Sequence, residues 1–166
     1  EVVLNTSMTG YQEILTDPRY RGQIVTMTYP EIGNYGVNEE DVESHHPHLS
    51  GFVVRENSRI ASTFRSQDTL HNYQAKHGII GLEGIDTRSL VRRIRTVGAL
   101  KGVLSTTDLD DESLVKKAQE SPGLVGRDLV QEVIPSETVN WEESLNEWSR
   151  DPSLGTVEKQ TEHHIV

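Results

Sequence analysis

Several short segments of the chain alternate apolar and polar side chains with the period of a β-strand. Residues 21–30 ("RGQIVTMTYP") present two alternating faces and stop at Pro30, which predicts a strand. Two further apolar runs, 49–57 ("LSGFVVREN") and the glycine-bounded 77–86 ("HGIIGLEGID"), are short and strand-like. The first residues, 1–5 ("EVVLN"), are strand-like as well. We therefore expect at least four short strands.

Helical patterns lie between and after these strands. Residues 65–78 ("RSQDTLHNYQAKHG") predict a helix that ends at Gly78, because glycine tolerates the left-handed conformation of a helix end. The clearest helix covers 86–99 ("DTRSLVRRIRTVGA"), with Asp86 or Thr87 as the cap and Gly98 at its end. Its apolar residues form one stripe at helical spacing: Leu90, Val91, Ile94 and Val97.

The second half of the chain continues this alternation before it loses its pattern. Residues 100–108 ("LKGVLSTTD") predict another strand, and 110–121 ("DDESLVKKAQES") predict a helix with acids first and lysines later, as the helix dipole favours. A short helix is also expected from Tyr11 to Leu15. Strands that alternate with helices predict an α/β domain. From residue 135 the apolar period fades, and 149–164 resembles a linker.

The composition of the chain excludes several classes of function. The chain has 166 residues, enough for one domain and a tail, and 25% of them are charged. No apolar run approaches the roughly 18 residues that span a bilayer, so we expect no membrane partner. The formal net charge of −10 argues against duplex nucleic acid. Cysteine is absent, which excludes disulfides, thiolate metal sites and a cysteine nucleophile within these residues and is compatible with a cytoplasmic setting.

Three histidines near the middle of the chain raise the hypothesis of a metal site. His45, His46 and His48 stand close together, and Glu43 is a candidate further ligand. Adjacent residues of a strand point to opposite faces, however, and Pro47 sets a bend rather than a ligand geometry. We favour an exposed polar loop over a small metalloprotein and expect no metal.

A basic run on the clearest helix is a second candidate site. It consists of Arg88, Arg92, Arg93 and Arg95, with Lys101 just beyond. In an acidic protein such a face could meet an anion or an acidic partner surface. The alternative, which we favour, is that these arginines occupy the solvated side of an amphipathic helix.

Catalytic motifs are absent. The glycines of 77–86 lie within a predicted strand rather than after it, so no phosphate-binding loop is expected. Ser7 and Thr9 lie in a hydroxyl-rich run without an evident base and orienting partner. The turn-rich, tyrosine-bearing segment 5–38 therefore fits an interface better than a catalytic site.

Residues 1–38 ("EVVLNTSMTGYQEILTDPRYRGQIVTMTYPEIGNYGVN") closely resemble the amino-terminal domain of the small chain of glutamine-hydrolysing carbamoyl phosphate synthetase. The likeness continues through 84–104 ("GIDTRSLVRRIRTVGALKGVL") and 122–133 ("PGLVGRDLVQEV"). The final "HHIV" resembles the first strand of the class I amidotransferase domain that follows in this family.

The resemblance implies a fold and a domain plan. The implied fold is a three-layer β/β/α swivelling domain of the α/β class, with one mixed or parallel sheet and one antiparallel sheet. The family's usual first strands are expected to be missing. We therefore expect the family domain at 1–135, a linker at 136–162 and the start of an amidotransferase domain at 163–166.

The resemblance also implies a function for the parent protein. In the family, the small chain hydrolyses L-glutamine with a cysteine nucleophile and a His–Glu pair in its second domain. It passes ammonia to a large chain, which binds ATP and Mg and makes carbamoyl phosphate in the cytoplasm for pyrimidine and arginine synthesis. Without a cysteine, these residues are expected to be a non-catalytic, cofactor-free part that supports subunit assembly and the edge of the glutamine site. The alternative is a stand-alone binding or regulatory module.

One residue departs from the family at that edge. The family's corner reads like "TDPSY", and its serine contributes to the glutamine pocket, whereas residues 16–20 read "TDPRY" and place Arg19 there. Arg19 could keep a main-chain contact, and its cation suits the α-carboxylate of glutamine. The alternative is a solvated arginine without energetic effect.

Overall fold

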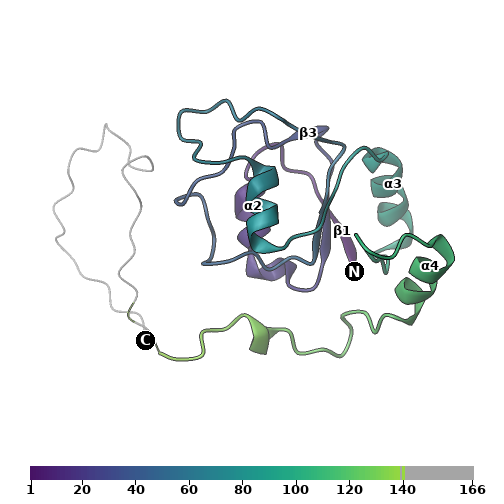
Figure 1. The fold of residues 1–166 in the computed structure, drawn as a ribbon. Coiled ribbons are helices and arrows are strands. Elements are labelled where there is room, and N and C mark those ends of the chain that lie inside the picture. Colours follow the sequence, from purple (N-terminus) through teal and green to yellow (C-terminus); the bar gives the residue numbers. More distant parts are fainter. Residues whose placement is uncertain (139, 141–166) are drawn as a thin grey trace. The chain divides into compact units, whose positions relative to one another are not determined.

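The computed structural model describes residues 1–138 and 140 (Figure 1). Residues 1–134 form one compact unit, and residues from 135 onward are grouped separately. The expected linker, apart from 136–138 and 140, and the expected strand at 163–166 lie outside the described residues.

A parallel sheet forms the centre of the unit. Its order is β1–β2–β4–β6, all neighbours are parallel, and the strands cover Val2–Asn5, Ile24–Met27, Gly51–Val53 and Gly81–Leu82. All four residues of β2 are buried, because the strand has a neighbour on each side and side chains packed on both faces. The four expected strands are therefore confirmed.

The prediction of a fifth strand at residues 100–108 is wrong. Among the described residues this segment pairs with the sheet only at Leu100, which forms an isolated antiparallel bridge to Val2. The Val2 main-chain N–H donates to the Leu100 carbonyl at 2.6 Å. Two residues later, a Cβ added to Gly102 would lie 2.4 Å from Val2 Cγ2, so the chain approaches β1 closely without pairing along it.

A second, small sheet confirms the expectation of two sheets, and the larger sheet is parallel as expected, but the second sheet is not antiparallel. It consists of β3 (Glu31–Ile32) and β5 (Glu56–Asn57), which run parallel, so the expected antiparallel second sheet is not what these strands form. The reason is connectivity: β3 follows β2 after a short turn, and β5 follows β4 after two residues. Because β2 and β4 are parallel, their continuations are parallel too.

Helices accompany the sheet in the described part of the chain. They are α1 (Tyr11–Thr16), η1 (Pro18–Tyr20), α2 (Leu70–His77), α3 (Thr87–Val97), α4 (Asp111–Glu120) and η2 (Val130–Glu132). Figure 1 shows α2 and α3 on opposite sides of the sheet, an arrangement consistent with three layers in an α/β domain. Within the described part of the chain, no helix has the length and apolar character to cross a bilayer.

The helix ends follow the sequence signals. Asp86 accepts a hydrogen bond from the Ser89 N–H at 3.0 Å and caps α3, while Gly98 ends it. Gly78 adopts a left-handed conformation with φ +67° at the end of α2. The apolar stripe of α3 is narrower than expected, because Ile94 is buried but Val97 is 63% exposed.

Two tyrosines hold α1 in the core. Helix α1 begins after Gly10 without a side-chain cap of its own. The Tyr35 hydroxyl takes that place, because it accepts hydrogen bonds from the main-chain N–H groups of Gly10 at 2.5 Å and Tyr11 at 3.2 Å. The Tyr11 ring stacks on Tyr35 at 4.2 Å, and its hydroxyl donates to the Gly36 carbonyl at 2.6 Å. The short helix expected from Tyr11 to Leu15 is therefore confirmed, and both of these residues are fully buried.

We predict that Tyr35→Phe lowers the free energy of unfolding by about 1–3 kcal/mol, since two N–H groups of the α1 start lose their acceptor. Urea unfolding followed by far-UV circular dichroism measures the change. The control is Tyr29→Phe, because Tyr29 is exposed and its hydroxyl has no described hydrogen bond. Equal stability of the two variants would contradict the capping role.

Candidate functional site

The corner between α1 and η1 positions Arg19. Asp17 Oδ1 accepts a hydrogen bond from the Arg19 N–H at 2.9 Å and so caps η1, in which Pro18 is the first residue. The Asp17 side chain is only 10% exposed, whereas the Arg19 side chain is 87% exposed. The corner therefore has a buried carboxylate and an external cation.

Asp17 and Arg19 also form an ion pair. Arg19 Nε donates to Asp17 Oδ2 at 2.8 Å, and one terminal nitrogen lies 2.6 Å from the same oxygen. Burial acts to raise the pKa of Asp17, but the hydrogen bonds from Arg19 outweigh it and hold that pKa below its usual value. The guanidinium is thus oriented by its own neighbour, and its Nη1 has no partner among the described residues.

A small hollow of about 320 Å³ adjoins this corner. It is lined by Asn5, Ser7, Thr9, Gly10, Glu13, Ile14, Asp17, Arg19, Tyr20 and Glu43. Burial raises the pKa of Glu13, whose Oε2 is buried without a hydrogen-bond partner in the described part of the chain. Three carboxylates and one guanidinium line the hollow, so it presents groups for both an ammonium and a carboxylate. Such a set can bind and orient an amino acid.

The histidine cluster contributes to the packing of its loop. Residues 1–138 and 140 contain no group of three or more His, Cys, Asp or Glu side chains that could hold a metal ion. His48 is buried, and its Nε2 lies 3.0 Å from Ser44 Oγ. Ser44 Oγ donates to the Thr16 carbonyl at 2.6 Å, so this pair is not a nucleophile with its base. The hydrogen bonds of Ser44 and His48 instead connect the loop before β4 to the end of α1.

The His48 ring is adapted to its packing role. Burial, and to a lesser degree the neighbouring His46 and Arg21, lower the pKa of His48. The His46 and His48 rings lie 4.3 Å apart between centroids. A neutral His48 therefore fits its position, because ionisation would place a charge at a buried site.

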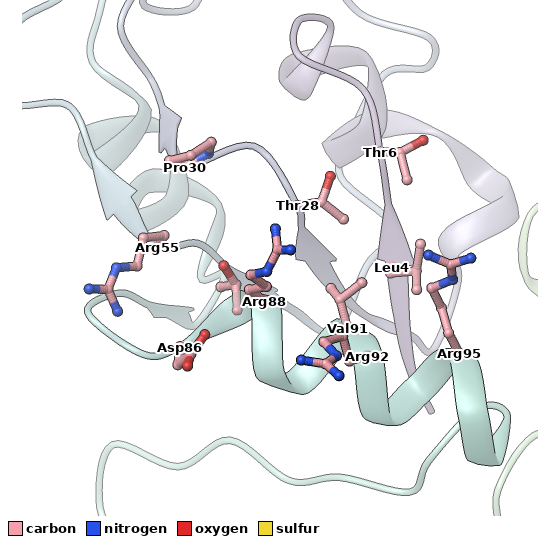
Figure 2. A pocket seen from close by; sticks show the side chains of 11 residues that line it. Leu4, Thr6, Thr28, Pro30, Arg55, Asp86, Arg88, Val91, Arg92 and Arg95 are labelled. Atoms are coloured by element: carbon pink, nitrogen blue, oxygen red, sulfur yellow. The ribbon is translucent and has the colours of Figure 1, made fainter.

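The basic run on α3 lines a larger hollow, of about 630 Å³ (Figure 2). Three of its predicted members, Arg88, Arg92 and Arg95, line this hollow together with Arg55, which sequence reasoning missed. No local signal marks Arg55, because it lies between β4 and β5, far from α3 in sequence. Lys101 is used elsewhere: its Nζ donates to the carbonyls of Gln119 and Ser121.

Comparison with known proteins identifies the family. The family described as "Carbamoyl-phosphate synthase small chain, CPSase domain" matches residues 1–104. The chain is 62% identical to the carbamoyl phosphate synthase small chain of Rhodopirellula baltica over 163 residues, which are 93% of this chain and 42% of that protein. It is also 62% identical to the small chain of Syntrophotalea carbinolica, over 86% of this chain and 38% of that one.

A third relative matches along the whole chain. The small chain of Aquifex aeolicus is 47% identical over all 166 residues, which correspond to 44% of its own length. The chain thus spans about two fifths of the length of the curated relatives it matches. The family match and these identities together show that the chain belongs to the carbamoyl-phosphate synthase small chain family.

Proposed function

We propose that this chain is the amino-terminal, non-catalytic part of the small subunit of a glutamine-hydrolysing carbamoyl phosphate synthetase that acts in the cytoplasm. The observation that carries the proposal is the 62% identity over 93% of the chain to a carbamoyl phosphate synthase small chain. In this proposal the whole enzyme makes carbamoyl phosphate from glutamine, bicarbonate and ATP, with Mg and ATP bound on a large chain. Its product enters pyrimidine and arginine synthesis.

Within that enzyme, we assign the described domain two tasks. One is assembly with the large chain, and the other is to form the edge of the glutamine site next to a following amidotransferase domain. The corner hollow supports the second task, because its carboxylates and Arg19 present complementary charges for an amino acid. Asp17 holds the guanidinium through Nε and one terminal nitrogen, which leaves N–H groups on its outer side for the α-carboxylate of glutamine.

The coding sequence beyond Val166 tests the domain plan directly. A cysteine within a Gly-x-Cys-x-Gly element downstream supports the glutaminase assignment, because it supplies the nucleophile that these residues lack. A stop codon directly after Val166 would instead favour a stand-alone binding module.

We predict that residues 1–166, purified alone, release no ammonia from L-glutamine above the buffer rate, because the sequence contains no cysteine to form a thiolate. A coupled ammonia assay makes the measurement, and the full-length parent protein is the positive control. Ammonia release from a preparation free of host glutaminase would contradict the assignment.

We predict that Arg19→Ala in the full-length enzyme raises the KM for glutamine about 3- to 10-fold, because a charge-assisted contact to the α-carboxylate is lost from a largely solvated site. Synthesis driven by added ammonia should be unchanged, since it bypasses the glutamine site. Steady-state kinetics with glutamine and with ammonia as nitrogen donor show whether only the glutamine-dependent reaction is affected.

Arg59→Ala is the matched control, because Arg59 is also exposed but lies outside the corner hollow. Unchanged glutamine kinetics in Arg19→Ala would show that the side chain is not used. Loss of both activities would assign the corner to folding or subunit assembly.

A further inference from the structure

The hollow beside α3 is a groove with positive charge along its length. Figure 2 shows Arg88 and Arg95 rising from α3 on the side that faces Thr28 and Leu4, with Val91 between them. Arg92 projects from the same helix away from the strands. Residues 88 and 95 are seven positions apart, so the basic row extends about 10 Å along the helix.

The floor of this groove is apolar and its far wall carries hydroxyls. Leu4, Val91 and Pro30 supply the apolar contacts. Thr6 and Thr28 directly follow the ends of β1 and β2 and line the wall opposite the helix. The groove therefore offers an apolar contact between flanking cations, which a compact inorganic anion would not use.

The arginines of the row have no ion-pair partner among the described residues. Ion pairs elsewhere in the described residues use Arg19, Arg21, Arg65, Lys116, Lys117 and Arg127. Within that same part of the chain, Arg88, Arg92 and Arg95 form no ion pair, although the sequence has ten more negative than positive charges. Arg92 follows Arg88 by four positions and precedes Arg95 by three, spacings at which like charges on a helix repel.

The details of the α3 start disfavour a phosphate group. Asp86, at one end of the groove, accepts hydrogen bonds from the Ser89 N–H and hydroxyl, so the capping position that a phosphate would take is already occupied by a carboxylate. Arg55 donates to the Ile85 carbonyl at 3.1 Å and is partly engaged. The groove therefore presents the separate guanidinium groups of α3 beside its apolar floor.

We propose that this groove, formed by Arg88, Val91, Arg92, Arg95, Leu4 and Thr28, is a docking surface for an acidic polypeptide segment of the synthetase's other subunit. The segment supplies Asp or Glu side chains to the arginines and one apolar side chain to the floor at Val91. Charge complementarity and the apolar contact together match the usual composition of a subunit interface, in which arginine is enriched. The inference rests on the proposed function, because it names the site of an assembly that this function requires.

The test compares two charge reversals on one helix. In the full-length small chain, Arg95→Glu alters the groove, while Arg93→Glu makes the same charge change at an exposed position that does not line it. Association with the large chain is measured by biolayer interferometry at low and high salt, and thermal unfolding of each uncomplexed small chain is recorded. Arg88→Glu is a second groove variant.

We expect Arg95→Glu and Arg88→Glu each to raise the Kd about tenfold at low salt, with a smaller difference at high salt because salt screens the charges. Arg93→Glu should bind like the wild type, and the Tm values of the free chains should agree. Wild-type affinity in both groove variants overturns the inference but leaves the proposed function standing.

Other results identify other occupants and also overturn the inference. A lower Tm of the free Arg95→Glu chain with unchanged association would mean that the groove is covered within the small chain itself. Arginine-dependent binding of tripolyphosphate with unchanged association would mean a small-anion site. If the wild-type small chain does not associate with the large chain at all, the proposed function fails, and the inference fails with it.

Discussion

The start of helix α1 depends on one aromatic pair. Tyr35 stacks on Tyr11 and accepts the first N–H groups of the helix, while the Tyr11 hydroxyl donates to the Gly36 carbonyl. Gly36 has φ +77°, and a Cβ at this position would lie 2.0 Å from Ser66 Oγ, so only glycine permits the loop to pass here. The pair ties α1 to the loop after β3, and every residue of the Asp17 corner depends on that placement.

The corner extends this scaffold to the surface. Leu15 and Thr16 are fully buried at the end of α1, and Asp17 then turns the chain into η1. The buried carboxylate orients an external guanidinium at Arg19, where the family resemblance expects a serine. The side chain at this position therefore differs in chemistry from the serine that the resemblance implies.

The end of β1 separates two surfaces of opposite character. Asn5 and Ser7 line the acidic hollow of the corner, whereas Thr6, between them, lines the basic groove beside α3. Successive residues of an extended chain point to opposite sides, so one short segment serves both hollows. Both surfaces lie at the carboxyl ends of parallel strands, the edge at which α/β sheets commonly place their binding sites. An acidic chain thereby keeps a concentrated basic face in one place.

The sequence by itself determined the local features. Strands β1, β2 and β4 follow from their apolar runs, and α2 and α3 follow from their period and from the caps at Gly78 and Asp86. These signals succeed because they depend on neighbours within about four residues. The resemblance of residues 1–38 to the family also required only the sequence, and the comparisons confirm it.

Only the tertiary structure decided which distant residues meet. Tyr35 caps a helix that begins 24 positions earlier, and Arg55 joins the arginines of α3 across one hollow. The sequence predicts a strand at 100–108, but this segment pairs with β1 only through the single bridge at Leu100 in the described residues. The small second sheet is parallel because it continues two parallel strands. Periodicity reports which face of an element is apolar, but it carries no information on which element will cover that face. Packing of the whole chain makes that choice.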